Sequence, residues 1–195
     1  MICYIVCIMH TYRILVILGS TRKQRLCPQI ATWVRFSGEE TLPAQYETID
    51  LRDWPLPMDD EPGVPAHGQY VQNHTQRWSE KISSADAVVF VTPQYNWGYP
   101  APLKNALDHL YKEWADMPAM VVTYGGHGGS KCSHQLRQVL DGLHMKPVKT
   151  APGLNIPRSV IEDNSGNIDP TLIFASQRSK VIRAFRELHQ KILGK

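Results

Sequence analysis

Residues 85–114 read ADAVVFVTPQYNWGYPAPLKNALDHLYKEW, and this stretch decides the fold class. Residues 87–92 form a nearly continuous apolar run of strand length, which is typical of a strand buried on both faces of a sheet. After a loop, Ala101–Trp114 places Leu103, Leu107, Leu110 and Trp114 at three- and four-residue spacing, as an amphipathic helix does. A strand followed by a helix is the repeating unit of a parallel α/β sheet.

The rest of the chain repeats this unit. Further strands are predicted over Arg13–Leu18, Tyr46–Leu51, Ala119–Tyr124 and, more weakly, His144–Thr150. Helices are predicted over Cys27–Ser37, Gln69–Ser84, Ser130–Asp141 with Ser130 as N-cap, and Thr171–Leu193. Five strands alternating with five helices predict a flavodoxin-like three-layer α/β sandwich, with a parallel sheet in the order 2-1-3-4-5 and helices on both faces.

Composition predicts one domain over residues 13–195, because 195 residues with 43% hydrophobic and 20% charged side chains suit a single globular core. Residues 1–12 are predicted to be an apolar extension that runs into the first strand. They lack a basic start and are too short to span a bilayer, so no membrane span is expected.

The charge balance and the cysteines exclude several classes of protein. The net charge of +3 is too small to indicate a nucleic-acid binder. It is unevenly spread, since residues 1–38 contain five basic and no acidic side chains. The four cysteines fit neither a disulfide framework nor a metal-ligand spacing, which favours reduced thiols in a cytoplasmic protein. No residues are assigned to a metal.

Residues 52–68 contain four prolines and two glycines, so neither a helix nor a central strand is expected there. The apolar Trp54 and Leu56 would be unusual in a solvated tether, and we expect this loop to fold over a subunit interface or the rim of a ligand pocket. Its acidic pair, Asp59 and Asp60, is interpreted as solvated.

Ligands of open α/β sheets bind at the carboxyl ends of the strands, beside the point where the strand order reverses. After the first strand, Gly19 allows a sharp turn, and Ser20, Arg22 and Arg25 offer a hydroxyl and two guanidinium groups near a helix N-terminus. Neither GxGxxG nor GxxxxGK[ST] is present, so the loop suits a monophosphate such as that of FMN better than a pyrophosphate. A solvated polar loop is the alternative.

Two further loops lie at the same edge. Pro93, Gln94, Tyr95, Asn96 and Trp97 follow the third strand, where stiff aromatic backbone can lie against a flat heterocycle. Gly125 and Gly126 follow the fourth strand, where glycine lets backbone donors approach a ligand closely. The alternative is that the aromatic rings only dock the loop on the core. His127 is more often a loop residue than a catalytic one.

Other catalytic arrangements are absent, since the sequence has no GxSxG, HExxH or CxxC motif. No catalytic side chain is assigned, because hydride transfer needs a flavin and a nicotinamide held face to face and little else.

Three segments carry a family resemblance: ILGSTRKQR (17–25), residues 85–114 quoted above, and AMVVTYGGHGG (119–129). Through them the chain, from Arg13 to Met145, resembles the NAD(P)H-dependent FMN reductase family of flavodoxin-like quinone reductases. One departure is Cys27, where many relatives have glycine.

The resemblance implies non-covalently bound FMN, NADPH or NADH as co-substrate, a quinone or flavin as acceptor, and a homodimer. It also implies that Ser20, Arg22 and Arg25 hold the phosphate and that 93–97 and 125–126 hold the ring. Two alternatives remain: a non-enzymatic electron carrier of the flavodoxin type, and a redox-sensing flavoprotein that binds a protein partner.

Overall fold

The computed structural model describes residues 11–58, 60–163 and 165–194; most of the predicted extension, residues 1–10, lies outside them. All strand pairs are parallel and the main order is β2-β1-β3-β4-β5, with β6 also paired to β4, which confirms the predicted topology. The strands are β1 (Arg13–Leu18), β2 (Gln45–Asp50), β3 (Ala87–Pro93), β4 (Pro118–Gly125), β5 (Lys146–Pro147) and β6 (Gly153–Asn155).

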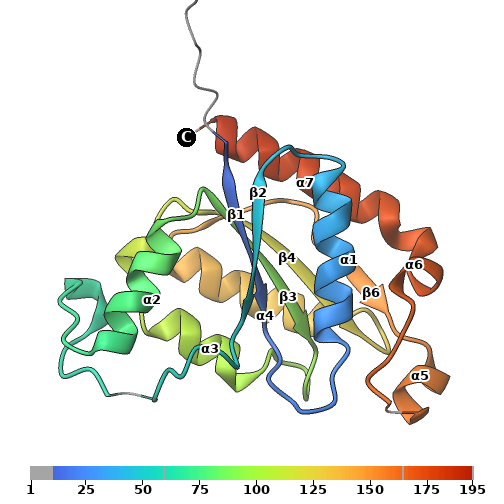
Figure 1. Cartoon of the computed structure of the whole chain (residues 1–195), viewed down its shortest axis with the longest axis horizontal. Helices are drawn as coiled ribbons and strands as arrows, with labels where there is room; N and C mark the ends of the chain where they lie inside the picture. Colours follow the sequence, from blue (N-terminus) through green and yellow to red (C-terminus); the bar gives the residue numbers. More distant parts are fainter. Residues whose placement is uncertain (1–10, 59, 164, 195) are drawn as a thin grey trace, which may run out of the picture.

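Helices cover both faces of the sheet (Figure 1). Ile14 and Val16 of β1 pack in one core with α1 (Cys27–Glu39) and α7 (Arg178–Leu193). Leu15 and Ile17 pack in a second core on the opposite face. The helices of that second face are α2 (Asn73–Ser83), α3 (Ala101–Asp108) and α4 (Ser130–Gly142). Alternate side chains of one strand therefore enter two cores, which is why β1, β3 and β4 are nearly continuous apolar runs.

The fifth sheet position differs from the prediction of one strand over 144–150. β5 pairs with the start of β4, and β6 pairs with its end, so the position is filled in two pieces. Between them Thr150 is held by Glu187, whose carboxylate accepts the backbone N–H of Thr150 at 2.7 Å. Pro147 and Pro152 flank this break and cannot donate to the ladder, which explains the interruption.

Several helix boundaries also differ. The helix predicted over 101–114 ends at Asp108 and is followed by the 3₁₀ turn Lys112–Trp114. The C-terminal helix is divided into α6 (Pro170–Ile173), the 3₁₀ turn Ala175–Gln177 and α7, and the short helix α5 (Arg158–Asp163) was not predicted. Ser130 is the first helical residue instead of the N-cap, which is Gly129 with φ +75°.

The proline-rich loop folds over the second core, on the side of α2 and α3. The ring of Trp54 lies 4.9 Å from the ring of Trp78, centroid to centroid, and Leu56 packs against the same cluster. A 3₁₀ turn, Pro65–His67, lies within this loop, where no helix was expected. None of the helices in the described residues has the length and apolarity needed to cross a lipid bilayer.

Candidate functional site

The loops after β1, β3 and β4 meet at one edge of the sheet, because these three strands are neighbours and end at nearly the same level. They enclose a pocket of about 280 Å³. Seven of the ten predicted site residues line it: Arg22, Arg25, Pro93, Gln94, Tyr95, Gly125 and Gly126. Its remaining wall comes from Gln24, Leu26, Tyr124, Ile156, Val160, Ile161 and Gly166.

Ser20 does not line the pocket but ties two of its loops together. Its side chain is fully buried, and its hydroxyl oxygen lies 2.8 Å from the phenol oxygen of Tyr95. Arg22 adds a second contact between the same loops, since its guanidinium carbon stands 3.8 Å from the centre of the Tyr95 ring. The hydroxyl group that the sequence suggested for a ligand is therefore engaged within the protein.

Arg25 is held by the neighbouring strand. Its side chain is 6% exposed; Nη1 donates to Asp50 Oδ1 at 2.9 Å, and Nη2 pairs with Asp50 Oδ2. Nη1 also donates to the backbone carbonyl of Ser20. Burial of Asp50 opposes its ionisation, but bonds from Arg25 and from the Arg52 N–H outweigh that cost and lower its pKa. The terminal nitrogens of Arg25 thus link the backbone of the loop after β1 to Asp50 on β2.

The loop after β1 also contains hydrogen-bond donors that have no partner in the described residues. In the described part of the chain, the backbone N–H groups of residues 21–25 donate to no other group. Arg25 Nε is buried and has no partner there either. Arg22 and Lys23 are exposed beside these donors, and α1 begins two residues after Arg25. Unpaired donors, cationic side chains and a helix N-terminus together fit a phosphate group.

The two glycines of the third loop have no internal reason to be glycine. Neither Gly125 nor Gly126 has a positive φ. A Cβ would come no closer than 3.8 Å to Gln94 at the first position and 3.5 Å to Ile161 at the second. Gly129, by contrast, has φ +75°, and its Cβ would lie 2.8 Å from Thr123 Cβ. The space beside Gly125 and Gly126 faces the pocket, which fits a flat ring approaching the backbone.

Gly19 serves packing more than turning. A Cβ there would lie 2.6 Å from the Thr92 hydroxyl oxygen, while its φ is not positive. Cys27 also leaves the loop unobstructed, since its side chain is buried and its thiol donates to the Val91 carbonyl at 3.3 Å. Burial raises the pKa of this thiol to about 11, against bonds from Tyr124 and Ser20 that lower it, so Cys27 is a packed, unreactive group.

Asn96 and Trp97 form the exposed tip of the loop after β3. Tyr95 and Gly98 exchange two backbone hydrogen bonds of 2.9 Å across this tip. Asn96 and Trp97 themselves have positive φ values of +47° and +72°. Trp97 is 63% exposed and lies outside the pocket, with Lys131 Nζ 3.2 Å from its ring centre. His127 is likewise exposed and does not line the pocket.

The part of the site that the sequence did not indicate is the wall formed by α5. Val160 and Ile161 belong to this short helix, and Ile161 is 49% exposed at the pocket. Asp50 was also missed, since it follows from the pairing of β2 with β1 and not from a motif. Ile161 is half exposed and lies in a helix of only six residues, which is too short to show a periodic pattern in the sequence.

A parallel sheet in the order β2-β1-β3-β4-β5, with helices on both faces and a pocket at the carboxyl edge of its central strands, defines a protein of the flavodoxin-like fold. The sequence profile of the NADPH-dependent FMN reductase family matches residues 12–155. The chain therefore belongs to the NADPH-dependent FMN reductase family.

Individual relatives agree with this assignment. The chain is 51% identical over 182 residues to an NAD(P)H-dependent FMN reductase of Schizosaccharomyces pombe, covering 92% of this chain and 90% of that one. It is 34% identical over 166 residues to an NADPH:quinone oxidoreductase of Arabidopsis thaliana, covering 80% and 81%. The fold is similar to that of FerB, an NAD(P)H:acceptor oxidoreductase of Paracoccus denitrificans, with TM-score 0.70 and 20% identity over 93% and 99% of the chains.

Proposed function

We propose that this protein is an FMN-dependent oxidoreductase that takes hydride from NAD(P)H and reduces a quinone or a flavin. The observation that carries the proposal is one pocket lined both by Arg22, Gln24 and Arg25, from the loop with unpaired backbone donors, and by Gly125 and Gly126. Family membership favours this enzyme over an electron carrier or a redox sensor. When bound, FMN supplies the chemistry, accepting two electrons from the nicotinamide and passing them to the acceptor.

The residues of the chain then act by binding and orienting. The N–H groups of residues 21–25 and the side chain of Arg22 hold the phosphate, while Arg25 and Ser20 keep that loop in place. Pro93, Gln94 and Tyr95 support one edge of the ring, and Gly125 and Gly126 let backbone approach another. The N–H groups of the glycine loop favour negative charge on the reduced ring. Asn96 and Trp97, at the exposed loop tip, are proposed to face the incoming nicotinamide or acceptor.

We further propose a homodimer in the cytoplasm. The dimer is supported by a hollow lined by Trp54, Leu56 and Met58, because a second subunit would cover this contiguous apolar surface, in which Met58 is 75% exposed. A reducing compartment is supported by Cys27 and Cys132, which are free and buried. Light scattering of the purified protein and cell fractionation test these two statements separately.

The enzymatic proposal is tested by adding FMN to the purified protein and then NADPH or NADH, with and without a quinone. We expect flavin absorbance that bleaches with the reduced nicotinamide and returns on addition of the quinone. An electron carrier would stay oxidised until a partner reductase was added. Protein that binds no FMN, or that binds it and never oxidises NADPH or NADH, contradicts the proposal.

A further inference from the structure

A second cluster of chemically active side chains lies away from the pocket of the FMN loops, where the proline-rich loop crosses α2 and α3. Asp60, His74 and His109 each place one potential ligand atom within 4.8 Å of the others. His74 Nε2 lies 3.0 Å from Asp60 Oδ2, and both side chains are about one quarter exposed. His109 is 6% exposed at the end of α3. Segments distant in the sequence thus bring two imidazoles and a carboxylate together.

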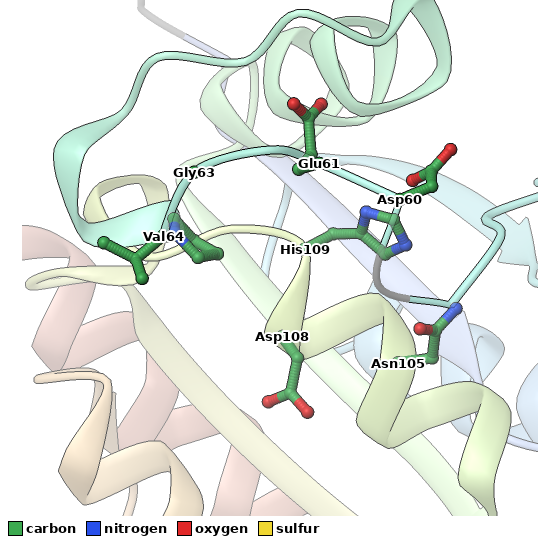
Figure 2. A pocket seen from close by; sticks show the side chains of 8 residues that line it. Asp60, Glu61, Gly63, Val64, Asn105, Asp108 and His109 are labelled. Atoms are coloured by element: carbon green, nitrogen blue, oxygen red, sulfur yellow. The ribbon is translucent and has the colours of Figure 1, made fainter.

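A hollow of about 250 Å³ lies beside two members of this cluster, Asp60 and His109. Asp60, Glu61, Asp108 and His109 line it, and Figure 2 shows Asp60 beside His109, with the carboxylates of Glu61 and Asp108 pointing to either side. Three of these residues are acidic and one of them, Asp108, pairs with Lys104, so the lining keeps a negative balance that favours a cation. Glu61 itself is occupied, because its carboxylate accepts the backbone N–H groups of Val71 and Gln72.

The hydrogen bonds around His109 resemble the outer shell of a metal site. Nε2 of His109 lies 2.9 Å from the Pro57 carbonyl oxygen, to which only a protonated nitrogen can donate. That bond leaves the Nδ1 lone pair of a neutral imidazole facing the Thr75 hydroxyl at 3.3 Å. Metal-bound histidines commonly donate their other N–H to a backbone carbonyl in this way. The buried Thr75 hydroxyl also bonds to the Glu61 carboxylate, so it keeps a partner when an ion replaces its longer contact with Nδ1.

We propose that Asp60, His74 and His109 form a binding site for a divalent transition-metal ion, of which Zn²⁺ is the best match. Two imidazole nitrogens and one carboxylate oxygen are ligands that zinc accepts, with a water completing a tetrahedron. The hollow provides room for that water and a path for the ion. Small side-chain rotations would bring each ligand atom to about 2.0–2.2 Å from a zinc ion placed between them. The bound ion ties the proline-rich loop to α2 and α3, and this site does not depend on the proposed enzymatic function.

The test uses the full chain without an affinity tag, loaded with FMN, stripped with a chelator and dialysed against Zn²⁺. We expect one zinc ion per chain, and a melting temperature that rises with zinc concentration because the ion binds only the folded state. Replacing Zn²⁺ by Co²⁺ should add ligand-field absorption at longer wavelength than the flavin bands.

Asp60→Asn and His74→Asn each remove one ligand from a partly exposed position, and we expect at least tenfold weaker zinc binding in each. His67→Asn is the matched control, since His67 is an exposed histidine of the same loop outside the cluster. Circular dichroism and FMN content verify that each variant is folded, and the two variants test the site independently. Wild-type protein that retains no zinc, unchanged affinity in both variants, or equal loss in His67→Asn overturns the proposal.

Discussion

The hydroxyl of Ser20 and the phenol of Tyr95 lie 2.8 Å apart, although 75 positions separate them in the sequence. This bond joins the loop after β1 to the loop after β3, and Arg22 packs on the same ring. The two loops that form the phosphate end and the ring end of the proposed FMN site are therefore joined directly. We expect a change in either loop to alter the geometry of both ends.

Tyr95→Phe removes only the hydroxyl and keeps the ring beneath Arg22. Because the buried Ser20 hydroxyl loses its partner, we expect about 1 kcal/mol less stability and about three- to tenfold weaker FMN binding. Thermal unfolding and flavin fluorescence titration measure the two effects. Tyr99→Phe is the control, because no bond of the Tyr99 hydroxyl is present within the described residues. Equal effects of both changes would contradict a specific role for the Ser20–Tyr95 bond.

Asp50→Asn tests the brace beneath the loop. It leaves the buried Arg25 guanidinium without its counter-charge, and we expect a loss of about 2–3 kcal/mol in unfolding free energy together with weaker FMN binding. Urea denaturation of the FMN-free protein isolates the stability effect. Glu39→Gln removes an exposed partner of Arg35 in α1 and should cost less than about 0.5 kcal/mol. A stable Asp50→Asn protein would show that the Arg25–Asp50 pair is not needed.

The same pair predicts a pH dependence. Since the folded state lowers the pKa of Asp50, its contribution to stability is fully present above the unfolded pKa of about 3.9 and is lost as the pH falls through the folded value. The difference in unfolding free energy between wild type and Asp50→Asn should therefore be constant near neutral pH and shrink below about pH 4. Denaturation curves between neutral and acidic pH measure it, and a difference that grows on acidification would reverse the assigned sign.

Arg22→Gln separates binding from folding. Arg22 is exposed, so we expect stability to change by less than about 0.5 kcal/mol, while loss of a charge-assisted bond to the phosphate weakens FMN binding about tenfold. Binding of riboflavin, which lacks the phosphate, should be unaffected. Arg77→Gln, an exposed position on α2, serves as the charge-matched control. If Arg22→Gln weakens FMN and riboflavin binding equally, Arg22 does not recognise the phosphate.

Gly125→Ala and Gly126→Ala test whether these residues are glycine for the ligand or for the fold. The protein itself leaves room for a Cβ at both, so we expect nearly unchanged stability without FMN and at least tenfold weaker FMN binding. Gly129→Ala provides the opposite case, since its positive φ and the contact with Thr123 should cost more than about 1 kcal/mol of stability. Normal FMN affinity in both Gly125→Ala and Gly126→Ala would show that the flavin ring does not contact this loop.

Much of the architecture could be read from the sequence. The Arg13–Leu18 strand is predicted to the residue, and the strands Ala87–Pro93 and Pro118–Gly125 are correct within one residue at each end. Strands buried on both faces are almost entirely apolar, which makes them easy to recognise. The order of the strands and the edge where the three loops meet follow from the alternation of strands and helices. Predictions failed where periodicity is weak or prolines intervene, as in the two-piece strand at 146–155.

The sequence by itself therefore determined the sheet, the three loops and the family, since these depend on local patterns of apolar side chains, glycines and helix starts. Tertiary structure alone decided the use of each side chain. It paired Arg25 with Asp50, bonded Ser20 to Tyr95, placed α5 against the pocket and brought His74 and His109 to Asp60. The physical reason is that buried polar groups must find partners, and only the folded chain determines which distant groups lie within reach.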